Sequence, residues 1–261
     1  MKIIAGPCQH ESFEQSFKIA SSLSHLSNVL NFEYYFKASF DKANRTSLSG
    51  KRGLGFHETL EDFKALKNSV IPNLKILTDV HEIWQINTIA TEYSDVIDVI
   101  QIPAFLCRQT DLIKSACDTD FIVNIKKGQF LAPWDVSGIL SKTKDAKEVW
   151  ITERGTSFGY NTLINDFTGI QYMLDNYPDV NIVFDATHSV QKPGGNGASS
   201  GGNRHYVPTV ARAAAAVGVS TFFMETHPDP DRAPSDGPNM VKLDQMPGLV
   251  QTLIEIGRIV K

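Results

Sequence analysis

The chain of 261 residues has no long apolar run, no excess of basic charge and few cysteines. No window of about 18 apolar residues is present, which excludes a transmembrane helix. Lys and Arg number 25 against 29 Asp and Glu, so the net charge is −4. This balance excludes the broad basic surface that nucleic acids or anionic membranes require. Three cysteines, Cys8, Cys107 and Cys117, form no disulfide framework and indicate a soluble, cytoplasmic protein.

Several motifs and a domain linker are also missing. No G-x-G-x-x-G turn follows the first apolar run, which disfavours an open, doubly wound sheet that binds a dinucleotide. No CxxC or HxxxH spacing indicates a metal site, and no Pro- or Ser-rich linker divides the chain. We therefore expect one domain over residues 1–261.

Short apolar runs alternate with helical patterns along the whole chain. Eight runs read as buried parallel strands: Lys2–Gly6, Phe32–Ser39, Lys75–Val80, Val96–Ile102, Phe121–Lys126, Glu148–Thr152, Asn181–Ala186 and Ser220–Glu225. Helical stripes follow, such as Leu163, Phe167, Ile170, Leu174 and Tyr177. Eight such units match the roughly 250 residues of a (β/α)8 barrel. The predicted fold class is α/β, a single-domain TIM barrel.

Three connections that follow strands are long, namely 40–56, 189–206 and 227–242. All three run from a strand to a helix, so they lie on the barrel face that carries the chemistry. The connection 191–202 is rich in glycine, which indicates a mobile loop or a lid over that face.

Polar residues end all eight predicted strands. The cations among them, or just beyond them, are Lys37, Lys42, Arg45, Arg108, Lys126, Lys127 and Arg154. Seven converging cations in an acidic protein predict a site for more than one anion, such as two phosphates and a carboxylate. Strand alternation also allows one lysine of the Lys126–Lys127 pair to point outward and be half solvated.

A second group of strand-end residues consists of Cys8, His188 and Glu225, with Asp236 on the connection after the last strand. One thiolate, one imidazole and two carboxylates suit Fe²⁺, Zn²⁺, Mn²⁺ or Co²⁺. Taken alone, Cys8 is equally a small buried apolar residue, and His227 a loop histidine with a structural hydrogen bond.

At this point the residues resemble a known family, 3-deoxy-D-manno-octulosonate 8-phosphate synthase. The motifs that carry the resemblance span nearly the whole chain: Ala5–Cys8, Phe36–Arg45, Thr78–Glu82, Gln101–Asp111, Asn124–Phe130, Glu153–Gly155, Phe184–Gln191 and Met224–Pro230. The resemblance implies a barrel enzyme, usually a homotetramer. Such enzymes condense phosphoenolpyruvate with D-arabinose 5-phosphate and water, and release phosphate, in lipopolysaccharide biosynthesis.

The resemblance also implies roles for individual residues. Phosphoenolpyruvate is expected at Lys42, Lys126 and Arg154, in a pocket that Lys37, Ser39, Gln101 and Arg108 also line. Asn44, Arg45 and Thr46, the last in place of the family's serine, are expected to clamp arabinose 5-phosphate, with a neighbouring subunit meeting its phosphate end. Asp79 and His81 are candidates for proton handling, so the expected catalytic residues are Lys42, Asp79, His81 and Lys126.

The family divides into metal-dependent members, with cysteine at the position of Cys8, and metal-independent members, with asparagine there. This chain therefore resembles the metal-dependent class, and the resemblance implies one divalent ion on Cys8, His188, Glu225 and Asp236.

Two alternative functions remain to be tested. One is 3-deoxy-D-arabino-heptulosonate 7-phosphate synthase, which uses erythrose 4-phosphate; the run 42–45 favours the five-carbon sugar. The other is a non-catalytic barrel that binds a phosphorylated sugar or a protein, which predicts gaps in the ring of polar residues.

Overall fold

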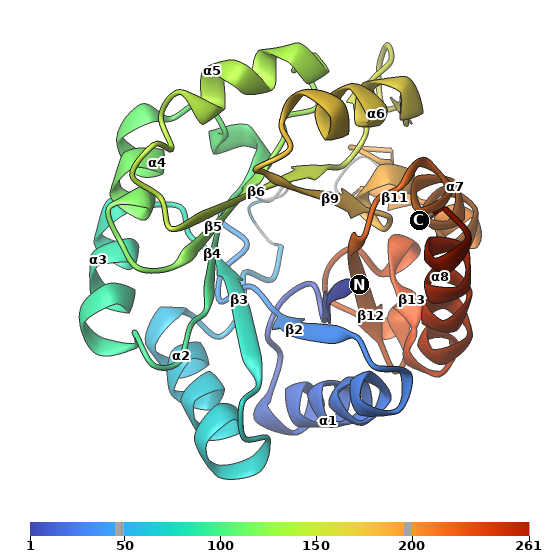
Figure 1. Cartoon of the computed structure of the whole chain (residues 1–261). Coiled ribbons are helices and arrows are strands. Elements are labelled where there is room, and N and C mark those ends of the chain that lie inside the picture. The colour runs from blue at the N-terminus through green and yellow to red at the C-terminus, as the bar shows by residue number, and fades with distance from the viewer. Residues whose placement is uncertain (45–47, 49, 196–199, 261) are drawn as a thin grey trace.

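The computed structural model describes the chain except residues 45–47, 49, 196–199 and 261. Within the described part, eight parallel strands form a closed barrel, because the first strand pairs with both the second and the last (Figure 1). The strands are β1 Lys2–Gly6, β2 Glu33–Lys37, β3 Lys75–Asp79, β4 Val99–Ile102, β5 Ile122–Lys126, β6 Glu148–Glu153, β9 Asn181–Asp185 and β12 Thr221–His227. The predicted (β/α)8 barrel is confirmed.

Helices cover the outside of the barrel (Figure 1). They are α1 Phe13–Leu30, α2 Phe56–Ala65, α3 Ile83–Glu92, α4 Thr110–Cys117, α5 Val136–Leu140, α6 Phe167–Asn176, α7 Val207–Val217 and α8 Met246–Val260. Among the described residues, no helix combines the length and apolarity needed to cross a membrane.

The interior of the barrel changes from apolar to polar along most of its strands. One buried cluster fills the part of the interior nearer to the starts of the strands: Ile4, Tyr35, Leu77, Val99, Trp150, Val183 and Phe223. Side chains of a strand alternate between its two faces, so the residue two positions further along points inward again. In six of these strands that residue is polar: Lys37, Asp79, Gln101, Thr152, Asp185 and Glu225. The same alternation that builds the core therefore builds a polar layer above it.

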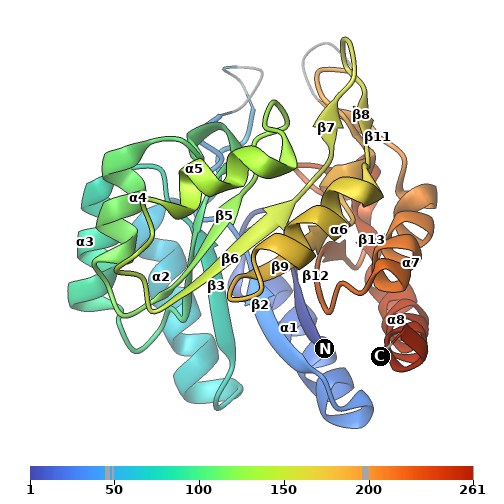
Figure 2. The ribbon, with the colours of Figure 1, turned by 45° about the horizontal axis from the view of Figure 1, so that its top comes forward.

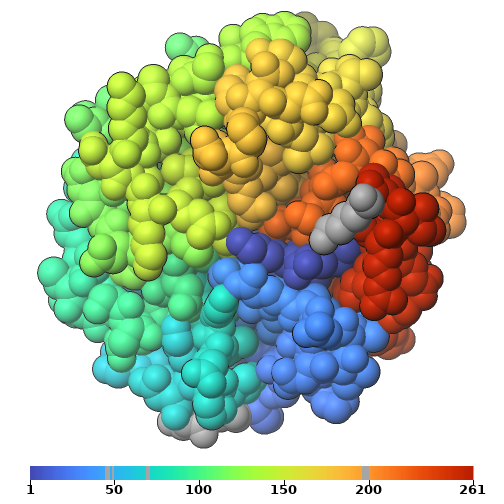
Figure 3. All heavy atoms as spheres, viewed as in Figure 1, coloured from blue at the N-terminus to red at the C-terminus, as the bar shows by residue number. Residues whose placement is uncertain are grey.

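The end of the barrel at which the strands begin is closed by ion pairs over aromatic rings. Lys2 Nζ lies 3.4 Å from Glu148 Oε1 and 4.9 Å from the centroid of the Trp150 ring. Lys75 pairs with Glu33 and lies 5.1 Å from the centroid of the ring of Tyr35. The blue atoms of the first residues accordingly lie at the centre of this face (Figure 3).

Two short hairpins stand at the opposite end, where the strands stop (Figure 2). One joins β7 Thr156–Ser157 to β8 Leu163–Ile164, and the other joins β10 Gln191–Lys192 to β11 Gly201–Gly202. The helical stripe predicted from Leu163 is wrong at its start. Leu163 pairs in β8, and α6 begins after Asp166, whose side chain accepts a hydrogen bond from the backbone N of Thr168.

Gly6→Ala should lower the free energy of unfolding by about 3 kcal/mol or more. A Cβ atom on Gly6 would lie 2.0 Å from the backbone oxygen of Lys37, so β1 and β2 would have to separate. Urea denaturation measures the difference. Gly248→Ala is the control, because its Cβ meets no atom within 4 Å, and we expect a gain of about 0.5 kcal/mol in α8. Equal stability of both variants would contradict the packing described for β1.

Candidate active site

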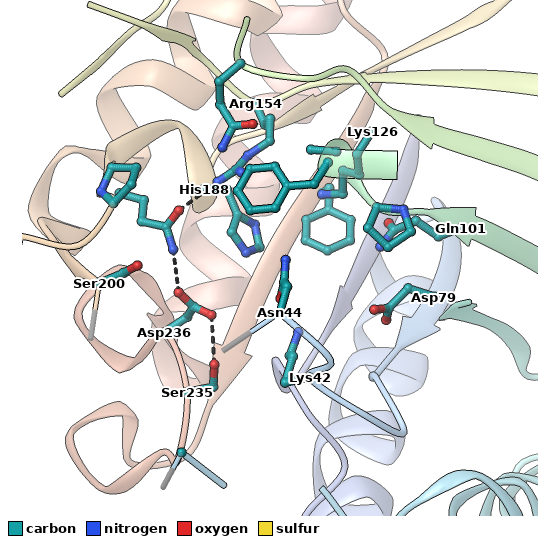
Figure 4. A pocket seen from close by; sticks show the side chains of 18 of the residues that line it. Lys42, Asn44, Asp79, Gln101, Lys126, Arg154, His188, Ser200, Ser235 and Asp236 are labelled. Carbon is teal, nitrogen blue, oxygen red and sulfur yellow. Dashed lines mark hydrogen bonds between the residues drawn. The ribbon is translucent and has the colours of Figure 1, made fainter. Parts of the chain in front are cut away.

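A cavity of about 450 Å³ opens at the ends of the strands. Ten of the residues predicted for the site line it: Lys37, Lys42, Asn44, Asp79, His81, Gln101, Lys126, Arg154, His188 and Asp236. Figure 4 shows eight of these labelled around one hollow, with Lys126 and Gln101 on one side and His188 and Asp236 on another. Residues from seven strand ends or the connections after them therefore meet at one place, as barrel geometry predicts.

Lys126 is a buried cation on the wall of the cavity. Its ammonium group forms an ion pair with Asp185 and lies 3.3 Å from the centroid of the Phe223 ring. Burial lowers the pKa of Lys126 to about 8, although Asp185 acts in the opposite direction. Near neutral pH this lysine is a weakly hydrated cation, which suits binding of a substrate anion.

Arg154 is connected to Asp236 through one amide. Arg154 Nη2 donates to Gln191 Oε1 at 2.7 Å, and Gln191 Nε2 donates to Asp236 Oδ1 at 2.7 Å (Figure 4). Burial lowers the pKa of Arg154, which still remains a cation at any physiological pH. Gln191 thus fixes a planar cation on one wall and a carboxylate on the next.

Lys37 organises the floor of the cavity. Its Nζ donates to Cys8 O and Ser39 Oγ at 3.0 Å each, and to Glu225 Oε1 at 3.4 Å. Three protein acceptors use all three donors of the ammonium group. Lys37 therefore supplies positive charge and holds its neighbours, while the more exposed cations remain available to substrate.

Asp79 and His81 form a pair on the wall made by β3. Ser39 Oγ donates to Asp79 Oδ1, and His81 Nε2 lies 3.4 Å from Asp79 Oδ2. Burial alone would raise the pKa of Asp79, but Lys37 and His81 hold it well below its usual range. Asp79 is therefore an anion that orients His81, and His81 is the member of the pair suited to exchange a proton.

The predicted metal ligands lie together beside this floor. Three potential ligand atoms, one each from Cys8, Glu225 and Asp236, all lie within 4.8 Å of one another. His188 adjoins them, with its Nε2 at 3.8 Å from Glu225 Oε2, which is buried and accepts no hydrogen bond from the described residues. The site therefore holds an unsatisfied buried carboxylate oxygen facing an imidazole nitrogen.

The protonation of Cys8 fits a cation site. Burial and Glu225 raise the pKa of the Cys8 thiol, which donates to Asp236 Oδ2 at 3.1 Å. Burial would lower the pKa of Lys42, but the nearby carboxylates of Asp79 and Glu225 raise it. A soft sulfur, an imidazole and two carboxylates are a donor set that suits a divalent transition metal, which would take the place of the thiol proton.

Six predicted site residues are not among the described residues that line the cavity, and two of them, Cys8 and Glu225, belong to the ligand cluster beside it. Ser39 is buried beneath the floor, where it bonds Lys37 and Asp79. Arg108 is exposed beyond η2 Ala104–Leu106 and is not among the described lining residues. Arg45 and Thr46 lie outside the described residues. The seven cations therefore do not all converge, because four of them line the cavity: Lys37, Lys42, Lys126 and Arg154.

Lys127 differs from the expectation of a half-solvated side chain. It points away from the cavity, as alternation allows, but it is completely buried, with its Nζ 3.1 Å from Glu153 Oε2. Glu153 Oε1 accepts from the backbone N of Arg154 at 2.9 Å and of Gly155 at 2.7 Å. Lys127 thus braces the turn that presents Arg154. His227 is likewise buried, at the end of β12, where its Nε2 lies 3.3 Å from Glu11 Oε1.

Three residues of the site had no role assigned from the sequence: Asp185, Gln191 and Phe223. Asp185 was visible as a charged residue at a strand end and as part of the motif Phe184–Gln191. Gln191 lies in a glycine-rich connection, where spacing gives no indication of partners. Phe223 reads as one more apolar strand residue, although its ring supports Lys126.

The family model described as the DAHP synthetase I family matches residues 1–261. The chain belongs to this family. Its curated relatives include proteins of Nitrobacter hamburgensis (52% identical over 263 residues, 100% of this chain and 89% of the relative) and Brucella anthropi (52% over 261 residues, 99% and 91%). A protein of Chelativorans sp. is 51% identical over 263 residues, which cover 100% of this chain and 92% of that protein. All three are named 2-dehydro-3-deoxyphosphooctonate aldolase, so the resemblance read from the motifs is confirmed.

Proposed function

We propose that this member of the DAHP synthetase I family condenses phosphoenolpyruvate with D-arabinose 5-phosphate and water. The products are 3-deoxy-D-manno-octulosonate 8-phosphate, a precursor for lipopolysaccharide, and inorganic phosphate. The observation that carries the proposal is one cavity lined by four cations in a chain half identical to aldolases named for that octonate. Relatives named for the octonate also favour the five-carbon sugar over erythrose 4-phosphate.

The charges of the cavity match those of the two substrates. Phosphoenolpyruvate brings a phosphate of about −1.5 to −2 and a carboxylate, and the sugar brings a second phosphate. We assign the phosphoenolpyruvate anion to Lys42, Lys126 and Arg154, and Asn44 to the sugar, with the undescribed Arg45 and Thr46. Holding two polyanions side by side overcomes their repulsion and supplies proximity.

The reaction joins C3 of phosphoenolpyruvate to the aldehyde carbon while water adds at C2. Negative charge that develops on oxygen in this step is stabilised by the fixed cations around the cavity. His81, oriented by Asp79, takes or returns the proton of the attacking water. Phosphate then leaves C2 by cleavage of the C–O bond, with Lys126 and Arg154 holding its charge.

We propose that Cys8, His188, Glu225 and Asp236 bind one divalent ion, Fe²⁺, Zn²⁺, Mn²⁺ or Co²⁺. The buried, unsatisfied Glu225 Oε2 and the mixed donor set support this assignment. When bound, such an ion supplies charge that polarises the aldehyde or orients the attacking water.

We also propose that the chain acts as a homotetramer in the cytoplasm. Exposed aromatic side chains lie on the connections that follow three neighbouring strands, β4, β5 and β6: Phe105, Phe130, Trp134, Phe158 and Tyr160. An apolar rim of this kind, with Arg108 beside it, suits contact with further copies of the chain that complete the sugar site. The three free cysteines suit a reducing compartment.

The pH profile should show the titration of Lys126. Its cation is needed to bind phosphoenolpyruvate, and its pKa in the free enzyme is about 8. We therefore expect kcat/KM for phosphoenolpyruvate to be level below about pH 7 and to fall as the pH rises through about 8, where the ammonium group loses its proton. Bound anions stabilise the ammonium form of Lys126, so kcat should stay constant up to a higher pH than kcat/KM does. In Lys126→Arg, whose cation does not titrate, the fall near pH 8 should vanish. A wild-type profile that stays flat to pH 10 would contradict this role.

Product analysis tests the proposed function. Purified protein with phosphoenolpyruvate, arabinose 5-phosphate and a divalent metal should yield equal amounts of inorganic phosphate and an eight-carbon phosphorylated acid sugar by mass spectrometry. Phosphate without the sugar acid, or no turnover with any of the four metals, would overturn the proposal.

A further inference from the structure

Asp185 is a completely buried carboxylate that lies between the two halves of the site. Its Oδ2 accepts hydrogen bonds from the Nζ of Lys126 and from Nδ1 of His188, the latter at 2.7 Å. Its Oδ1 accepts from the backbone N of His188 at 2.9 Å and from Thr187 Oγ1 at 3.0 Å. A carboxylate offers about four acceptor positions, so all of them are used.

This arrangement decides which nitrogen of His188 is free. The Nδ1 proton is donated to Asp185, so the lone pair of Nε2 points toward Glu225, whose Oε2 lies 3.8 Å away. A carboxylate on the far nitrogen is the usual way to fix the ligating tautomer of a metal-binding histidine. Thr187 Oγ1 also accepts from the backbone N of Glu225 at 3.3 Å, so Asp185 anchors the strand that carries a second ligand.

The same carboxylate oxygen sets the position of Lys126. Among the described residues, the ammonium group otherwise contacts the ring of Phe223, and it is largely removed from water. Its ion pair with Asp185 offsets that desolvation and fixes Nζ at the wall. Asp185 is not itself among the described residues that line the cavity, so it acts on substrate only through its neighbours.

We propose that Asp185 is a positioning residue for both subsites at once. It holds His188 in the tautomer that presents Nε2 to a metal ion, and it holds Lys126 against the phosphoenolpyruvate anion; the identity of that anion rests on the proposed function. One carboxylate therefore sets both affinities. Its loss weakens both, whereas loss of His188 weakens mainly metal binding and loss of Lys126 weakens mainly anion binding.

Asp185→Asn tests the proposal, because it keeps the volume and removes the charge. The side-chain amide of the variant would direct its N–H groups at two groups that are themselves hydrogen-bond donors. In chelator-stripped protein we expect Co²⁺ affinity, measured against a chromophoric chelator, to fall about 10- to 100-fold, with a changed Co²⁺ absorption spectrum. We expect the Kd of the metal-free protein for phosphoenolpyruvate, measured by calorimetry, to rise about 10-fold.

Three further variants make the comparison specific. His188→Gln should lose Co²⁺ affinity and keep phosphoenolpyruvate affinity, and Lys126→Met should do the reverse. Asp98→Asn is the matched control, because Asp98 also pairs with a lysine, Lys67, at 2.8 Å, but outside the cavity. It should leave both affinities unchanged.

Each outcome decides a different point. Wild type that makes the octulosonate, together with an Asp185→Asn variant that loses only one affinity or neither, overturns this inference and leaves the proposed function standing. Wild type that neither binds phosphoenolpyruvate nor turns it over overturns both. If Asp185→Asn does not fold, ¹⁵N spectra of histidine-labelled, metal-free wild type decide, with His188→Gln identifying the resonance. A neutral ring protonated at Nδ1 supports the proposal, and one protonated at Nε2 overturns it.

Discussion

Replacing Lys126 by methionine should lower kcat/KM for phosphoenolpyruvate by about 10²- to 10³-fold. The change removes a buried cation from the cavity wall and leaves Asp185 buried without its lysine partner. Both effects weaken binding of the substrate anion in the ground state, and they weaken stabilisation of the charge that develops in the transition state. Steady-state kinetics of phosphate release, with the metal supplied in excess, measure the loss.

Lys67→Met is the matched control for this prediction. Lys67 also forms an ion pair and is largely buried, but it lies outside the cavity, where it bonds Asp98 and the backbone oxygen of Val96. Its kcat/KM should stay within about twofold of wild type, with some loss of stability. Equal losses of activity in the two variants would mean that Lys126 acts through stability and not through substrate binding.

The second large effect is expected at the metal site. Cys8→Ser should lower the affinity for Zn²⁺ or Co²⁺ by about 100-fold, because one of four ligands carries roughly a quarter of the 10–16 kcal/mol typical of a protein zinc site. After dialysis against a chelator, the variant should contain little metal and have little activity, whereas wild type should regain activity when the metal returns. Metal analysis and phosphate release measure the two quantities.

Cys117→Ala serves as the control for the thiol. Cys117 is buried in α4 and is not part of the ligand cluster in the described part of the chain, so its loss should leave metal content unchanged. Full metal content and chelator-sensitive turnover in Cys8→Ser would remove Cys8 from the ligand set.

The sequence was sufficient to predict the barrel because two separate signals mark its strands. Each is an apolar run, and most end in polar residues that a buried strand would otherwise avoid. The inward alternation from Val99 to Gln101, or from Phe223 to Glu225, then places the polar residues in one layer. Four of the ten predicted residues that line the cavity, Lys37, Asp79, Gln101 and Lys126, are placed there in this way, and the other six follow on the connections after the strands.

The remaining features depend on partners that are distant along the chain. Lys127 is buried because Glu153, on the neighbouring strand, accepts its charge, and a count of cations cannot anticipate that pairing. Arg108 lies beyond a 3-10 turn that directs it away from the cavity of its own chain. Leu163 reads as the start of a helical stripe, but the hairpin of β7 and β8 takes it instead.

The most direct test of the central claim compares the two aldoses. Purified, metal-loaded protein is mixed with phosphoenolpyruvate and either arabinose 5-phosphate or erythrose 4-phosphate, and phosphate release is followed with time. The account predicts turnover with arabinose 5-phosphate and a kcat/KM at least about 100-fold lower with erythrose 4-phosphate, since a site built for a longer polar substrate leaves its groups unpaired with the shorter one. Preferred turnover of erythrose 4-phosphate would contradict the account and assign the chain to heptulosonate synthesis.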